Sequence, residues 1–195
     1  MVVVVWAVGL ALPACRTPAP PYDYSKEPDP RRQEFVIGPS DVLRISVWRN
    51  PDLSAEATVR PDGTITLPLV GDVMADGRTP GQVRAEIAQR LGGFIKDEAA
   101  TVAVAVTGVN SYRFTVSGNV EKGGLFTSKH FVTVMEAIAM AGGPTRFASA
   151  DQTLIVRPER GGKTRRIPVN YTAVSTGQRP EQNLVLLAGD TVFVP

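Results

Sequence analysis

The sequence predicts an α+β protein of two small domains, each with one main helix packed against a layer of strands. Two observations predict it. Short segments that alternate apolar and polar residues, typical of half-buried strands, recur along the 195 residues. Two capped amphipathic segments, typical of helices, are interspersed among them. A content of 43% hydrophobic and 21% charged residues is globular and excludes collagen, coiled coils and wholesale disorder.

The N-terminus resembles the signal of a bacterial lipoprotein. Residues 2–12 form an apolar run that is too short for a bilayer span of ~20 residues, but it fits the core of a secretory signal. Leu12-Pro13-Ala14-Cys15 follows, so we expect a signal peptide over 1–14 and lipid attachment at Cys15. An unmodified thiol is the alternative. Two features depart from the lipoprotein pattern: no basic residue precedes the apolar core, and Pro13 is unusual at its position. Arg16 replaces the Asp of an inner-membrane retention signal, which favours the outer membrane.

Residues 15–34 are predicted to form a stiff tether. The segment is rich in proline and almost free of aliphatic residues, so it cannot build a core of its own. Tyr22 and Tyr24 are interpreted as exposed linker tyrosines, with contact to a partner as the alternative.

The first domain is expected over 35–110. Alternation in 42–48 predicts a strand that buries Leu43, Ile45 and Val47. Asp62-Gly63 is typical of a tight turn. Further strands are expected over the following ranges: 57–60, 64–69, 71–74 and 101–106.

One helix is predicted in this domain, beginning after Thr79. Thr79 and Gln82 form a capping-box pattern, and Pro80 suits the first helical position. Val83, Ile87 and Leu91 recur every four residues on one face, and Gly92-Gly93 ends the segment.

The second domain is expected over 111–195. A strand is predicted over 112–117, a turn over 121–124, and a helix from Thr133, with Glu136 completing a second capping box. Val134, Ile138 and Ala141 share one face of that helix, and Gly142-Gly143-Pro144 stops it. Late strands are expected over 184–187 and 191–194.

A basic hairpin is the one electrostatic feature of this domain. If Gly161-Gly162 is a two-residue turn, Arg160 lies opposite Lys163, Val156 opposite Ile167, and Leu154 opposite Val169. Arg157 then faces Arg166, a like-charge pair that is destabilising unless an anion or Glu159 intervenes. The cluster is interpreted either as a solvated hairpin tip or as a contact for an acidic glycan, a lipid headgroup or an acidic partner: Arg157, Arg160, Lys163, Arg165 and Arg166.

The composition and the sequence context of the candidate residues argue against nucleic-acid binding, a metal site and catalysis. A net charge of +2 gives no support for nucleic-acid binding, and one Cys with one His excludes an internal disulfide and a Cys/His zinc site. No metal or cofactor is expected.

A glycosidase needs two carboxyls ~5–9.5 Å apart in a cleft, but the candidates lie in turn contexts: Asp41, Asp62 and Asp72. A catalytic role of His130 is not expected, because no nearby thiol or serine motif offers it a nucleophile. Trp48 and Tyr112 are suited to stacking on sugars, and equally to partial burial.

Five segments together resemble the outer-membrane polysaccharide export family. They are FVIGPSDVL at 35–43, VRPDGTITLPLVGDV at 59–73, VSGNV at 116–120, EAIAMAGG at 136–143 and LAGDTVFVP at 187–195. Turn glycines and backbone-bonding Asp residues dominate these motifs, which indicates structural roles. The motif residues are Gly38, Asp41, Arg60, Asp62, Gly63, Gly71, Asp72, Gly142, Gly143, Gly189 and Asp190.

The resemblance implies a polysaccharide-export domain followed by a β-grasp domain of the soluble-ligand-binding (SLBB) type. It also implies a non-enzymatic, lipid-anchored protein at the periplasmic face of the outer membrane, assembled as an oligomeric ring around a path for capsule or exopolysaccharide. Founding-type members continue into a C-terminal membrane-spanning helix, whereas this sequence stops at Pro195. We therefore expect a separate outer-membrane β-barrel and an inner-membrane co-polymerase as partners. A periplasmic glycan-binding adaptor or sensor that forms no conduit is the alternative.

Overall fold

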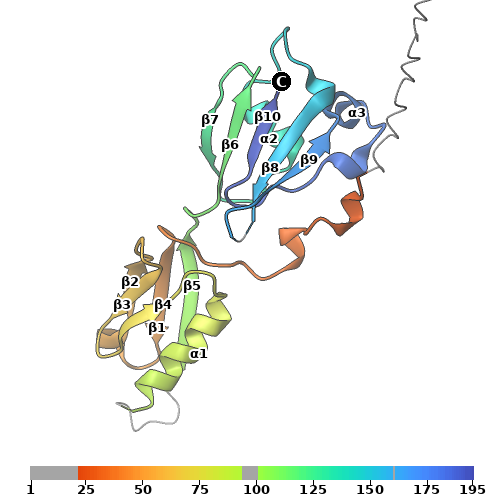
Figure 1. Cartoon of the computed structure of the whole chain (residues 1–195). Helices are drawn as coiled ribbons and strands as arrows, with labels where there is room; N and C mark the ends of the chain where they lie inside the picture. The colour runs from red at the N-terminus through yellow and green to blue at the C-terminus, as the bar shows by residue number, and fades with distance from the viewer. Residues whose placement is uncertain (1–21, 94–100, 160) are drawn as a thin grey trace, which may run out of the picture.

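The computed structural model describes residues 22–93, 101–159 and 161–195, which form two domains in succession (Figure 1). The predicted α+β class is confirmed. The signal peptide and Cys15 lie outside the described residues, as does Arg160. In the described part of the chain, no helix has both the length and the apolar character needed to cross a bilayer.

The first domain packs a three-stranded sheet, a hairpin and one helix around a single core. The sheet has the order β2-β1-β5 and the hairpin is β3-β4, with all pairs antiparallel. Leu43, Ile45 and Val47 are buried as predicted. The elements are β1 (Val42–Val47), β2 (Ala55–Thr58), β3 (Thr64–Leu67), β4 (Gly71–Met74), α1 (Pro80–Leu91) and β5 (Val102–Gly108).

Helix α1 begins where its capping box predicts. The Thr79 hydroxyl accepts from the Gln82 N–H, and the Gln82 side chain accepts from the Thr79 N–H at 3.0 Å. Two of the backbone donors that helices leave unsatisfied are thereby paired. Val83, Ile87 and Leu91 are all buried in the core of this domain.

The second domain is a five-stranded sheet of order β7-β6-β10-β8-β9, with β10 parallel to β6 and the other pairs antiparallel. The buried side chains of α2 pack with those of the sheet in one core. The Thr133–Glu136 capping box is confirmed. The elements are β6 (Arg113–Gly118), β7 (Gly124–Thr127), α2 (Val134–Met140), β8 (Thr153–Pro158), β9 (Thr164–Val169), α3 (Tyr171–Ser175) and β10 (Thr191–Val194).

The expected strand over 184–187 is wrong. Only one isolated bridge forms there, between Val185 and Thr133. The segment exchanges backbone hydrogen bonds with the residues that lead into α2: the Val134 N–H donates to the Leu184 carbonyl, and the Leu186 N–H donates to the Val132 carbonyl. Strand β7 and helix α3 are further elements that the pattern did not predict.

The predicted register of the basic hairpin is also wrong, by one residue. Ile155 lies opposite Ile167, and Arg157 lies opposite Arg165. The Glu159 N–H donates to the Lys163 carbonyl at 2.8 Å, so the turn is one residue wider than a two-residue loop. A slip of one residue turns every side chain of a strand to the other face. Arg157 therefore points into the domain.

The described part of the predicted tether, residues 22–34, lies against the second domain (Figure 1). We call it the N-terminal strap. It contains the short 3-10 turns Tyr24–Lys26 and Pro30–Arg32. Tyr22 and Tyr24 pack against the core of that domain, and the Tyr24 hydroxyl donates to the Pro168 carbonyl at 2.8 Å. The interpretation as exposed linker tyrosines is therefore wrong.

Candidate functional site

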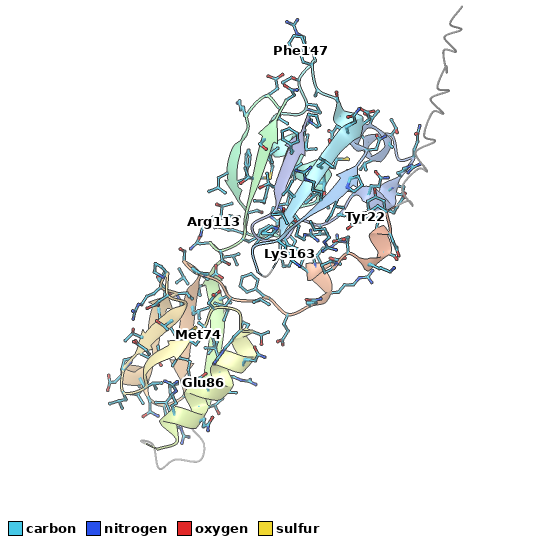
Figure 2. The ribbon with its side chains drawn as sticks, viewed as in Figure 1. Tyr22, Met74, Glu86, Arg113, Phe147 and Lys163 are labelled. Atoms are coloured by element: carbon cyan, nitrogen blue, oxygen red, sulfur yellow. The ribbon has the colours of Figure 1, made fainter. Side chains whose placement is uncertain are left out.

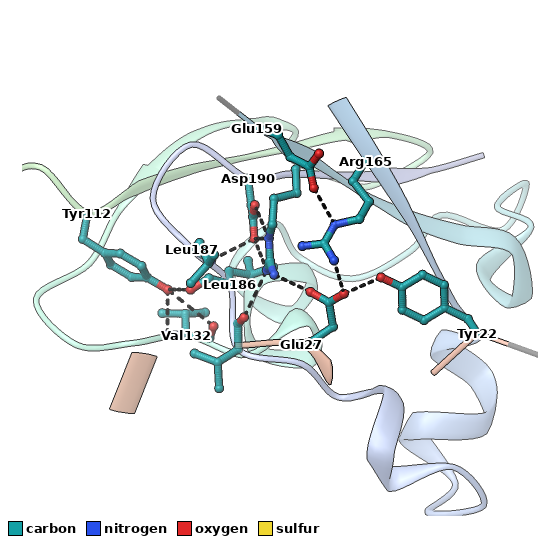
Figure 3. Close-up of polar contacts among 11 residues, drawn as sticks. Tyr22, Glu27, Tyr112, Val132, Glu159, Arg165, Leu186, Leu187 and Asp190 are labelled. Carbon is teal, nitrogen blue, oxygen red and sulfur yellow. Dashed lines mark hydrogen bonds and ion pairs between the residues drawn. The ribbon is translucent and has the colours of Figure 1, made fainter. Parts of the chain in front are cut away.

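The basic hairpin contains a buried arginine, Arg157, and Figure 3 shows its acidic partners Glu27 and Asp190. Arg157 on β8 is only 3% exposed. Its Nε and Nη2 donate to the carboxylate of Asp190, at 3.0 and 2.7 Å, and its Nη1 donates to Glu27 of the strap at 2.7 Å. Arg157 is therefore an internal residue, and the expectation that it contacts a glycan or partner is corrected.

Glu27 joins both strands of the hairpin. Its other carboxylate oxygen accepts from Arg165 on β9 at 2.8 Å and from the Tyr22 hydroxyl. Arg165 also forms an ion pair with Glu159, at 3.0 Å between its Nε and Oε1. The Glu27 side chain is 2% exposed and that of Asp190 is fully buried. The like charges of Arg157 and Arg165 are thus compensated by Glu27 of the strap together with Asp190 and Glu159.

The electrostatics of this cluster follow from burial and charge pairing. Burial, with the hydrogen bond to Glu27 and its charge, raises the pKa of Tyr22 to about 12. Burial disfavours the charged form of Arg157, but the hydrogen bonds and charge of Asp190, together with the charge of Glu27, raise the pKa of Arg157. Tyr22 stays neutral and Arg157 charged at neutral pH.

Lys163 and Arg166 are the members of the predicted basic cluster that lie on the described surface. Arg165 is partly exposed but paired with two carboxylates. Lys163 lies at the end of the second domain nearer to the first (Figure 2). The surface open to an acidic ligand is therefore smaller than the sequence indicates.

Asp41 links the first domain to the connection between the domains. It is fully buried, and its Oδ1 accepts from the N–H groups of Asn110 and Ser111, both at 2.7 Å. Its Oδ2 accepts from the Ser111 hydroxyl at 2.7 Å and from the Gly38 N–H at 2.9 Å. A Cβ on Gly38 would lie 2.6 Å from the Ser111 Cβ, so only glycine fits there. The motif residues Gly38 and Asp41 thus make structural contacts.

The acidic residues of the VRPDGTITLPLVGDV segment at 59–73, Asp62 and Asp72, also form hydrogen bonds and ion pairs. Arg60 pairs with Asp62 at 2.5 Å and with Asp72 at 3.5 Å. The hydroxyl and N–H of Thr64 donate to Asp62 and lower the pKa of its carboxyl. Thr66 donates to Asp72 at 2.6 Å. These bonds tie the β3–β4 hairpin to the residues before it.

Other sequence candidates divide between the interior and the surface. Tyr112 is buried and its hydroxyl is bonded to the backbone of Leu186 and Val132, so it offers no ring to a sugar. Trp48 is 64% exposed. His130 is exposed and lies 3.3 Å from the Ser128 hydroxyl. Among residues 22–93, 101–159 and 161–195, no group of three acidic, His or Cys side chains is placed to hold a metal ion.

Comparison with protein families matches both domains. Residues 29–106 match the polysaccharide biosynthesis/export protein family, and residues 113–168 match the SLBB domain. Together these matches cover more than half of the chain.

Three curated relatives are similar at distant identity. The exopolysaccharide production protein ExoF of Rhizobium meliloti is 29% identical over 80% of this chain and 37% of its own length. The capsule polysaccharide export outer membrane protein CtrA of Neisseria meningitidis serogroup A is 29% identical over 78% and 42%. The EPS I polysaccharide export outer membrane protein EpsA of Ralstonia solanacearum is 30% identical over 66% and 40%.

The chain spans less than half of the length of these relatives. The similarity nevertheless runs through both domains, in the order and at the positions of the two folded units. This chain belongs to the polysaccharide biosynthesis/export protein family.

Proposed function

We propose that this protein is a non-catalytic component of a machine that exports exopolysaccharide or capsule, and that copies of it form an oligomeric conduit for the glycan. The observation that carries the proposal is the succession of an export domain and an SLBB domain along one chain. The motif carboxylates of the export domain, at Asp41, Asp62 and Asp72, are bonded to backbone, hydroxyl and guanidinium groups. Carboxylates that are bonded to neighbouring groups of the fold have a structural role, which supports a non-catalytic protein.

The sheets supply edges suited to self-association. In the described residues, β2 and β5 end one sheet, and β7 and β9 end the other. Edge strands present unpaired backbone groups that pair readily with another chain, and head-to-tail contacts close into rings when their rotation permits. These edges support an oligomer, and a conduit lined by many weak polar contacts would release its glycan readily.

The proposed location is the periplasmic face of the outer membrane, with a lipid on Cys15. The outer-membrane β-barrel and the inner-membrane co-polymerase that we propose as partners are supported by the family resemblance. The anchor is tested by palmitate labelling of cells that express the wild type or Cys15→Ser. Equal labelling of the two would contradict lipidation.

A deletion strain tests the export function. If the protein is a conduit component, polysaccharide accumulates inside the cell and disappears from the surface, and the wild-type gene restores secretion. Altered polymer length or substitution would instead indicate an enzyme. Normal secretion with lost regulation would indicate the alternative, a periplasmic glycan-binding adaptor or sensor that forms no conduit.

A further inference from the structure

Trp48 is an exposed indole at the end of β1 opposite Asp41. It is 64% exposed, although an indole is among the side chains that gain most from burial. The residue after it, Arg49, has a left-handed backbone, with φ of 60°. This conformation is costly for a side chain other than glycine, and such strain concentrates at functional sites.

The backbone around Trp48 is held on both sides. The Trp48 N–H donates to the Thr101 carbonyl at 3.0 Å, and the Asn50 side-chain amide donates to the Trp48 carbonyl at 3.1 Å. The preceding residue, Val47, receives a bond from the Asn50 N–H and gives one to the Ser54 hydroxyl. The indole is thus carried by a fixed turn, and a ligand would bind it without first ordering a loop.

An open concavity of about 550 Å³ lies beside this turn. Its walls include Ser46, Trp48, Arg49, Asn50, Ser54 and Ala103. Among the described residues of this lining, Trp48 is the one large exposed apolar side chain and Arg49 is the one charged residue.

A saccharide fits this combination of groups. One face of a pyranose ring carries C–H groups that pack on the flat face of an indole, while its hydroxyls bond to polar groups at the rim. A guanidinium binds carboxylates through paired N–H donors. Arg49 is exposed, and its guanidinium has the donors that the carboxylate of an acidic sugar needs.

We propose that Trp48 and Arg49 form a contact site for an acidic polysaccharide, with a sugar ring on the indole and its carboxylate at the guanidinium. The proposal rests on the export function and names a place where the exported chain touches the protein. It requires only a weak site, since a glycan in transit must be released.

The test is secretion by a deletion strain that carries Trp48→Ala, Trp48→Phe or, as control, Phe147→Ala. Phe147 is 73% exposed and lies at the end of the second domain remote from the first (Figure 2). At equal protein level, we expect Trp48→Ala to lower secreted polysaccharide at least about fivefold, Trp48→Phe to retain most of it, and Phe147→Ala to secrete normally. Normal secretion by Trp48→Ala would overturn the site.

Binding is measured on the chain without the proposed signal peptide, in which Trp48 is the one tryptophan because Trp6 lies within residues 1–14. Titration with polysaccharide purified from the producing strain should change the tryptophan emission. Arg49→Gln, or reduction of the carboxyls of the polymer, should weaken binding severalfold. Unchanged emission, or equal binding of the native and reduced polymers, would overturn the proposal.

The two proposals fail separately. If the deletion strain itself secretes normally, the export function is wrong. If deletion stops secretion while Trp48→Ala restores it as fully as the wild type, the export function stands and the Trp48 site is wrong.

Discussion

Arg157 illustrates at the scale of single residues what local sequence cannot predict. Its partners, Glu27 and Asp190, lie 130 and 33 residues away along the chain. A cluster of like charges on a hairpin predicts that an anion is needed, but it does not predict which carboxylate supplies it. Asp62 was predictable as a turn residue, since its bonds to Thr64 span two positions.

Replacing Glu27 by Gln should destabilise the protein by about 3 kcal/mol. The change removes one charge from a buried ion cluster and leaves the two guanidiniums of Arg157 and Arg165 with less compensation, which is costly in the interior. Urea unfolding measures the loss. Glu34→Gln, the same substitution at an exposed position of the strap, should change the free energy of unfolding by less than about 0.5 kcal/mol. Equal effects of the two variants would show that the buried cluster contributes nothing.

Asp41 supports a second prediction at this scale. In the wild type, both oxygens of Asp41 accept hydrogen bonds from backbone N–H groups. The amide of Asp41→Asn keeps one acceptor oxygen, and its NH₂ group faces N–H donors that it cannot accept from. We expect a loss of about 2–3 kcal/mol, because buried donors lose their partners. Chemical unfolding beside Asp52→Asn, at an exposed position, provides the comparison. A variant as stable as the wild type would contradict the role of Asp41 as a link.

At the scale of elements, the features set by short-range patterns were predicted correctly, whereas the pairing of segments far apart in the sequence was not. Both capping boxes lie within four residues, so Thr79 and Thr133 start helices where their patterns indicate. The hairpin register depends on the loop length, which a Gly-Gly pair does not fix. The segment 184–187 has the alternation of a strand, but its backbone partners are Val132 and Val134 at the start of α2, far from it in sequence.

The start of α2 supports a prediction of pH dependence. The carboxylate of Glu136 accepts hydrogen bonds from the backbone N–H and the hydroxyl of Thr133. Both bonds lower the pKa of that carboxyl, the backbone bond more than the hydroxyl. A carboxyl with a lower pKa in the folded state adds stability above its unfolded pKa, and the addition is lost as pH falls through the folded value. Melting temperatures of the wild type should therefore fall more steeply below about pH 4.5 than those of Glu136→Gln.

Glutamine is the matched substitution at this position. It also completes a capping box, as Gln82 does in α1, but it does not titrate. Glu181→Gln, at an exposed position, is the control and should keep the acid slope of the wild type. If Glu136→Gln shows that same slope, the capping carboxylate makes no contribution to the pH dependence.

At the scale of the whole molecule, the two domains have separate cores joined through Asp41 and the connection near Ser111. Ile87 lies in the core of the first domain and Ile138 in that of the second, both fully buried. The sequence predicted two domains because each contains its own capped helix and strands. It did not predict that the N-terminal strap, which precedes the first domain, packs on the second, since that contact spans the whole first domain.

Calorimetry should resolve this organisation as two unfolding transitions, because domains with separate cores unfold as separate units. Ile87→Ala and Ile138→Ala each remove buried methyl groups, at a cost of about 2–4 kcal/mol, and each should lower a different transition. Glu27→Gln should lower the transition that Ile138→Ala lowers, although Glu27 is nearer to Ile87 in sequence. If Glu27→Gln instead lowers the transition that Ile87→Ala lowers, the strap unfolds with the first domain. If all three variants lower a single transition equally, the two domains unfold as one unit.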